Sequence, residues 1–155
     1  MKHIAILSDT HGLLREHVKA ELATVDLILH AGDIDNASVL EDLQKYGETY
    51  VVRGNNDKTW ADFLPMSLTI TIEGVRFFLV HNQKDIPKDL KDVDVVIYGH
   101  SHRYYADVVN GVLFLNPGSC GRRRFNLDIT MCHMTVNEGK YEFTKVVLPI
   151  DQPKG

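Results

Sequence analysis

The stretch Ile4-Ala5-Ile6-Leu7-Ser8-Asp9-Thr10-His11-Gly12 contains the pattern on which this chain is built. Its four consecutive apolar residues predict a short strand covered on both faces. The polar residues from Ser8 onward predict a loop at the carboxyl end of that strand. The same order returns further along, where the apolar run Leu27-Ile28-Leu29 precedes His30-Ala31-Gly32-Asp33. Apolar residues at helical spacing lie between the two runs, at Leu14, Val18 and Leu22. Residues 4–33 therefore predict a βαβ unit.

The rest of the chain continues the alternation and then becomes rich in strands. A second helix is predicted to begin with Asp35 or Asn36 as its N-cap and to end at Gly47. A third strand, Thr49–Val52, precedes another polar loop, and period-two alternation around a turn at Glu73-Gly74 predicts an antiparallel hairpin. Further strands are predicted at 93–98, 106–109, 112–115, 127–136 and 141–148. The expected fold class is α/β, a two-sheet sandwich flanked by helices, with residues 1–155 as one domain.

Composition excludes several classes of protein. The 155 residues are 44% hydrophobic and 25% charged, which is typical of a globular protein, and no apolar stretch is long enough to span a bilayer. A balance of 17 basic against 21 acidic residues gives a net charge of −4, which argues against nucleic acid as the main partner. Cys120 and Cys132 are too few for a disulfide framework and are expected to be buried. We expect a cytoplasmic protein without membrane association.

Five predicted strand ends carry side chains that bind metal ions. Two Asp, one Asn and four His are available, and these oxygen and imidazole donors suit Mn²⁺, Fe, Zn²⁺ or Co²⁺. Seven donors around one shared carboxylate make two four-ligand sites, as in two-metal phosphoryl-transfer centres. The carboxyl ends of parallel strands meet at one edge of a sheet, so the segments are expected to converge. They are Asp9-Thr10-His11, Gly32-Asp33, Gly54-Asn55-Asn56-Asp57, His81 and Gly99-His100-Ser101-His102.

Each segment also has a structural explanation when it is taken alone. The first could be a helix cap with a surface histidine, and the Gly-Asp and Gly-Asn-Asn-Asp segments could be turns. A single His81 is more often a packed histidine than a ligand. The combination of five such segments in one short chain favours a metal site.

These motifs resemble those of the calcineurin-like metallophosphoesterases, and within them the small single-domain prokaryotic phosphodiesterases. The resemblance covers nearly the whole chain and implies a two-sheet sandwich flanked by helices. It also implies two divalent ions, with Mn²⁺ expected first and Zn²⁺, Fe, Ni²⁺ or Co²⁺ as alternatives. Asp9, His11 and His102 are then implied to hold the first ion, Asn55, His81 and His100 the second, and Asp33 to bridge them.

The implied activity is hydrolysis of a small phosphodiester, with nucleotide-derived compounds among the candidates, by attack of a metal-bridging water or hydroxide. Asp33, Asn55, Asn56 and His100 are the predicted catalytic residues. Many relatives have a histidine in place of Asn56 that protonates the leaving group, and an amide cannot do this at neutral pH. We therefore expect a preference for good leaving groups. The alternatives are a phosphomonoesterase and a non-catalytic scaffold, because some eukaryotic relatives are scaffold subunits of membrane-coat complexes.

Other residues leave their roles open. His30 is equally explained as a partner of Asp33 and as a strand-end residue, and Arg53 as a phosphate contact or a solvated side chain. The segment 116–119 resembles one near the family's site, although a turn also explains it, and Arg122-Arg123-Arg124 is a phosphate clamp or a solvated loop. Trp60, Phe63, Tyr104 and Tyr105 belong either to the core or to the interface of a homo-oligomer.

Overall fold

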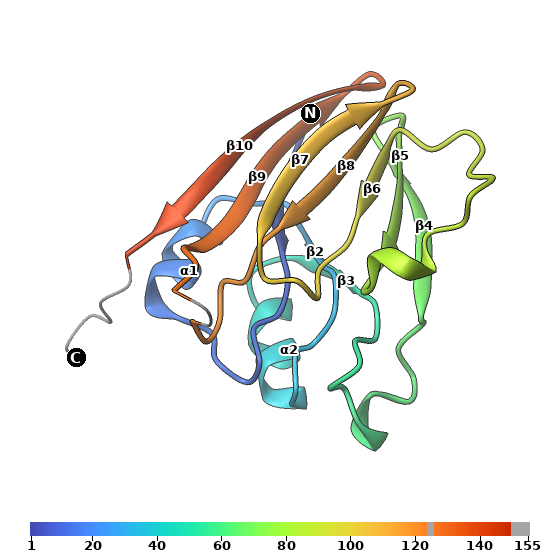
Figure 1. Ribbon diagram of the computed structural model, residues 1–155. Helices are drawn as coiled ribbons and strands as arrows, with labels where there is room; N and C mark the ends of the chain where they lie inside the picture. The colour runs from blue at the N-terminus through green and yellow to red at the C-terminus, as the bar shows by residue number, and fades with distance from the viewer. Residues whose placement is uncertain (124–125, 150–155) are drawn as a thin grey trace.

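Two mixed five-stranded sheets pack face to face in the computed structural model, which describes residues 1–123 and 126–149 (Figure 1). The first sheet has the strand order β10 (Lys140–Leu148), β9 (Ile129–Asn137), β1 (Lys2–Leu7), β2 (Leu27–His30), β3 (Glu48–Val51). The second has the order β4 (Ser67–Ile72), β5 (Val75–Val80), β6 (Val95–Ile97), β8 (Val112–Pro117), β7 (Tyr104–Val109). The expected two-sheet sandwich is confirmed.

Parallel pairing joins the strands that precede the polar loops. In the first sheet β1 pairs with β2 and β2 with β3, so that Ile6 lies opposite Leu29 and Leu29 opposite Tyr50. In the second sheet β5 pairs with β6 and β6 with β8, also in parallel. The remaining pairs are antiparallel, among them the predicted hairpin of β4 and β5. Each sheet therefore directs several strand ends, with their loops, to one edge.

The main core lies between the two sheets. Ile4 and Ile6 of β1 point inward and pack in one cluster with Phe77 and Leu79 of β5, and all four side chains are fully buried. Successive strand residues face opposite sides, so Ala5 and Leu7 point to the outer face of the first sheet. This explains why the run at residues 4–7 is apolar without alternation.

The two outer faces are covered differently. Helices α1 (Glu16–Glu21) and α2 (Ala37–Gln44) pack Val18 and Leu43 against the outer face of the first sheet. On the second sheet, Phe78 and Val96 are covered by Ile86 and by other residues of the segment 82–94, which includes the 3₁₀-helix Gln83–Asp85. Another 3₁₀-helix, Thr59–Ala61, follows the third polar loop. Both α-helices in the described part of the chain thus lie on the first sheet.

Several element boundaries differ from the predicted ones. Asn36 is the N-cap of α2, and its Oδ1 accepts a hydrogen bond from the Val39 N–H at 3.1 Å. The helix ends at Gln44, earlier than the predicted Gly47, because the Lys45 and Tyr46 N–H groups bond to carbonyls three residues back and form a tighter turn. Strand β7 begins at Tyr104, ahead of the predicted start at 106. Cys120 and Cys132 are buried as expected. Among the described residues, no helix is long and apolar enough to cross a bilayer.

Candidate metal centre

Backbone hydrogen bonds tie the strand-end loops together. The Asp9 N–H donates to the Gly32 carbonyl at 3.0 Å, and the His11 N–H donates to the Asp33 carbonyl at 2.9 Å. In the second sheet, the Gly99 N–H donates to the His81 carbonyl at 2.9 Å. Ser119, which follows β8, donates its hydroxyl to the Asp9 carbonyl at 2.9 Å. The loops that the sequence places after separate strands therefore form one continuous structure.

The first group of donors is buried. Asp9 Oδ1 lies 3.6 Å from His11 Nε2 and 3.5 Å from His102 Nε2. The two imidazole nitrogens are 3.2 Å apart. One ligand atom from each of these three residues lies within 4.8 Å of the others, which is the spacing of donors around a single ion.

The second group opens toward solvent. His81 Nε2 lies 3.2 Å from Asp33 Oδ2 and 3.0 Å from Asn55 Oδ1, and His100 Nδ1 lies 3.3 Å from the same Asn55 oxygen. Asp33 and His81 are buried, whereas Asn55 and His100 are exposed. The second group is therefore buried on the side of Asp33 and His81 and open to solvent on the side of Asn55 and His100.

Asp33 lies between the two groups. Its Oδ2 is 3.2 Å from His81 Nε2 in the second group and 3.8 Å from His11 Nε2 in the first. Asn56 holds this carboxylate by donating its backbone N–H to Oδ1 at 2.8 Å and its side-chain amide to Oδ2 at 3.3 Å. The structure thus brings all seven predicted donors together and places Asn56 beside Asp33.

The hydrogen bonds around the ring nitrogens show why these residues fit cations. The carbonyl of Ala31 and the carboxylate of Asp35 can only accept, so His81 and His11 each donate Nδ1–H to them, at 2.8 and 3.1 Å. In the neutral rings, both Nε2 lone pairs then point at the other donors. Within the described part of the chain, the buried Asp9 Oδ1 accepts no hydrogen bond. Lone pairs facing one another in a buried site repel, and divalent cations between them would remove that repulsion.

The pKa values in the metal-free protein also indicate that positive charge is stabilised at this site. Burial alone would raise the pKa of Asp33, but the hydrogen bond and charge of His81 outweigh it and lower this pKa to about 2. Burial opposes charge on His81, yet Asp33 and Asp9 together raise the pKa of the imidazole. The contact with Asp9 and the charge of Asp35 raise the pKa of His11. Protons are therefore held where cations fit.

Backbone strain and tight packing hold the loops in place. The five residues Asp9, His11, Asp33, His100 and His102 all have positive φ, between 46° and 73°. Such non-glycine conformations persist only where the surroundings impose them, and they cluster at functional sites. A Cβ atom at Gly54 would lie 2.1 Å from Asp33 Oδ1, and one at Gly99 would lie 2.0 Å from Ser8 Oγ. Glycine at these two motif positions is a steric requirement.

Two carboxylates beside the donors, the buried Asp57 and the half-buried Asp35, have roles at the site that the sequence did not predict. Asp57 accepts three backbone N–H bonds, from Asp33 at 2.9 Å and Gly54 at 2.8 Å to Oδ2, and from Asp35 at 2.9 Å to Oδ1. Asp35 fixes the ring of His11, whereas the sequence suggested it only as a helix cap. The signal for Asp57 was its place at the end of the Gly-Asn-Asn-Asp segment. Both residues act by positioning others.

His30 and Arg53 both form hydrogen bonds with backbone groups of the donor loops. His30 does not contact the Asp33 carboxylate; Nδ1 accepts the Gly32 N–H at 3.0 Å, and Nε2 lies 3.1 Å from Thr10 Oγ1. Burial lowers the pKa of His30 to about 4, so its ring is neutral. Arg53 is paired with Asp62 at 3.2 Å and donates to the Asp57 carbonyl.

The segment 116–119 is more than a turn. Buried Asn116 donates to Gly99 O at 3.2 Å and to Ser101 Oγ at 3.0 Å, which holds the loop that carries His100 and His102. Of the arginine run, Arg122 donates Nε–H to the His11 carbonyl at 3.2 Å, and Arg124 lies outside the described residues.

The four aromatic residues divide between core and surface. Trp60 and Tyr104 pack against the hydrophobic clusters, whereas Phe63 and Tyr105 are exposed.

A family model described as the calcineurin-like phosphoesterase superfamily domain matches residues 1–139, and the chain belongs to this superfamily, whose members bind divalent metals.

Within the superfamily, the chain is 32% identical over 131 residues to a probable metallophosphoesterase of Methanocaldococcus jannaschii, a match covering 75% of this chain and 67% of that protein. A protein of the same organism named as a phosphodiesterase is 30% identical over 138 residues, covering 76% of this chain and 83% of that one. The expected kinship with small prokaryotic metallophosphoesterases is confirmed. The crystal structure of Vps29 from Entamoeba histolytica, complexed with Zn²⁺, has the same fold: its TM-score is 0.74 at 21% identity, covering 94% of this chain and 98% of that one.

Proposed function

We propose that this chain is a phosphodiesterase that works with two divalent metal ions. Asp9, His11 and His102 would hold one ion, Asn55, His81 and His100 the other, and Asp33 would bridge them. The observation that carries this proposal is the position of the Asp33 carboxylate between the two donor groups. Its Oδ2 lies within 4 Å of His11 Nε2 in the first group and of His81 Nε2 in the second. The oxygen and imidazole donors suit Mn²⁺, Zn²⁺, Fe, Ni²⁺ or Co²⁺, and Mn²⁺ is proposed first because of the resemblance to the small prokaryotic phosphodiesterases.

The residues of the site then divide the work. When bound, a pair of divalent ions neutralises phosphoryl oxygens and lowers the pKa of water. The buried donors form the floor of the site, while exposed Asn55 and His100 face the side from which a phosphodiester arrives. In the metal-free protein the contact with His81 lowers the pKa of Asp33 to about 2, so its carboxylate is ionised at neutral pH, and Asn56 keeps this carboxylate oriented.

Asn56 explains the expected substrate preference. Its backbone and side-chain N–H groups both point at Asp33, and an amide does not release a proton at neutral pH. This residue therefore offers no proton to the departing alkoxide. We expect diesters with acidic leaving groups, such as nitrophenolate, to be the better substrates.

The test combines metal analysis with turnover. Wild type, Asp33→Asn and the exposed control Asp89→Asn are reconstituted with Mn²⁺, analysed for metal per chain, and assayed on bis(p-nitrophenyl) phosphate. Two equivalents of metal and metal-stimulated turnover are expected in wild type and Asp89→Asn, and both are expected to fall in Asp33→Asn. A folded wild type with neither bound metal nor turnover would refute the proposal.

The same assay separates the alternatives. Faster cleavage of p-nitrophenyl phosphate than of the diester would identify a phosphomonoesterase. Metal binding without turnover on either ester would support the scaffold alternative. We favour the enzyme because all seven donor positions retain donor side chains and converge in space.

A further inference from the structure

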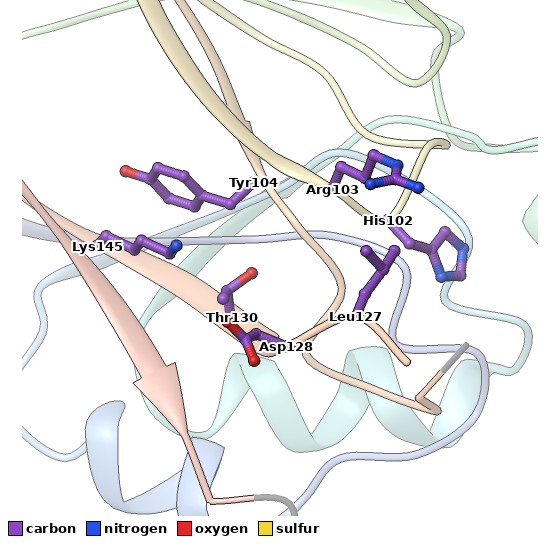
Figure 2. A pocket seen from close by; sticks show the side chains of 7 residues that line it. All are labelled: His102, Arg103, Tyr104, Leu127, Asp128, Thr130 and Lys145. Atoms are coloured by element: carbon purple, nitrogen blue, oxygen red, sulfur yellow. The ribbon is translucent and has the colours of Figure 1, made fainter. Parts of the chain in front are cut away.

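A polar pocket adjoins the candidate metal centre on the His102 side. Its lining includes His102, Arg103, Tyr104, Asp128, Thr130 and Lys145 (Figure 2). The cavity volume is about 230 Å³, which is room for several water-sized groups. Residues from β7 and β10 meet there, and Lys145 Nζ lies 5.0 Å from the centre of the Tyr104 ring. The two sheets thus build this pocket together.

The charge of the pocket is positive overall. Arg103 and Lys145 each contribute a cation, and Asp128 contributes one carboxylate. Within residues 1–123 and 126–149, neither cation has an ion-pair partner, and the exposed Arg103 uses only its backbone N–H, toward Ser101 Oγ at 3.3 Å. Burial raises the pKa of Tyr104, so its hydroxyl adds no negative charge. Two unpaired cations beside a phosphoryl site form a place for a second anion.

The position of His102 links the pocket to the reaction site. This buried side chain lines the pocket, while its Nε2 lies among the donors of the first group. In Figure 2 Arg103 lies beside His102, and Lys145 lies beside Tyr104 at the other end of the pocket. A substrate with its phosphodiester at the donors can therefore extend one ester arm past His102 into this pocket, where Arg103 at one end and Lys145 at the other attract a negatively charged group.

We propose that this pocket, named here the Arg103 pocket, binds a second phosphate group on one ester arm of the substrate. The inference rests on the proposed phosphodiesterase function and narrows its substrate class to diesters that carry an additional phosphate. Arg103 and Lys145 recognise that phosphate, and Asp128 weakens its binding by repulsion.

Binding tests the pocket without turnover. The Mn²⁺-loaded protein is titrated by calorimetry with thymidine 3′,5′-bisphosphate and with thymidine 5′-monophosphate, which differ by one phosphate. The bisphosphate should bind about tenfold more tightly, the factor expected of two exposed cation–phosphate contacts. This ratio should fall to within about threefold in the double variant Arg103→Gln, Lys145→Gln and rise in Asp128→Asn. It should be unchanged in Lys140→Gln, which removes a cation elsewhere on β10.

Hydrolysis separates the two proposals. The p-nitrophenyl ester of thymidine 5′-phosphate is compared with its 3′-phosphorylated analogue, and kcat/KM should be about tenfold higher for the analogue. Equal binding of the two nucleotides, or a binding ratio that persists in the double variant, overturns the Arg103 pocket even if both esters are hydrolysed. Failure to hydrolyse either ester counts against the phosphodiesterase, while the calorimetric ratio still decides the pocket.

Discussion

Replacing Asp57 by Asn tests how the donor loops are held in place. The side chain is 2% exposed and accepts three backbone N–H bonds, from Asp33, Gly54 and Asp35. An Asn side chain best replaces them by placing its amide oxygen at Oδ2, which keeps the bonds from Asp33 and Gly54. Its NH₂ group then faces the Asp35 N–H, donor against donor. One charge-assisted hydrogen bond is lost and two become neutral, so the free energy of unfolding should fall by about 3–4 kcal/mol.

Urea unfolding of the metal-free protein measures this loss. The control is Asp94→Asn, in which the same substitution affects a carboxylate that accepts one exposed backbone bond, from Arg76 N–H at 2.9 Å. We expect the control to lose no more than about 1 kcal/mol. Mn²⁺ affinity should also fall in Asp57→Asn, because Asp33 is itself a candidate ligand and Gly54 precedes the candidate ligand Asn55. Equal losses in the two variants would refute the role of Asp57 as the clamp of these loops.

Three further predictions concern neighbouring residues. Asp35→Asn should weaken Mn²⁺ binding by about ten- to hundredfold because the variant no longer orients His11 with a charged acceptor; unchanged affinity in a calorimetric titration would contradict this. His30 has a folded-state pKa of about 4 against about 6.5 when unfolded, so stability should fall by up to about 3 kcal/mol as the pH drops from 6.5 to 4. Urea unfolding at pH 5 and pH 7 should show a smaller difference in the free energy of unfolding for His30→Gln than for wild type. An equal difference in the two proteins would refute the assignment of this pH dependence to His30. Asn56→His should raise turnover most for diesters with alkyl leaving groups, and a gain of the same size for nitrophenyl esters would argue against proton donation.

The sheet sandwich was predictable because its parallel strands are short, doubly covered apolar runs followed at once by polar residues. Residues 4–7 and 27–29 carry that signal without help from tertiary structure. The convergence of the donors followed from the same rule, since parallel strand ends share an edge. Boundaries such as the end of α2 depend on a local choice between two hydrogen-bond patterns, which periodicity does not distinguish.

The positioning residues depend on contacts that local sequence does not reveal. Asp57 acts on backbone groups of a loop that follows a different strand, and the Gly-Asn-Asn-Asp segment also reads as a simple turn. The sequence alone allows Arg53 to contact a phosphate, whereas in the folded chain Arg53 pairs with Asp62. The Arg103 pocket forms only because Lys145 of β10 lies over Tyr104 of β7, which are strands of different sheets.

The seven candidate donors come from both sheets. Asp9, His11, Asp33 and Asn55 follow strands of the first sheet, and His81, His100 and His102 follow strands of the second. Ions bound among them would cross-link the two sheets at one end of the sandwich. Removing the ions would then let the layers part at that end first, while the far end, with the turns after β7 and β9, kept its packing. Metal binding would thus reduce local opening between the two sheets, in addition to changing the charge of the site.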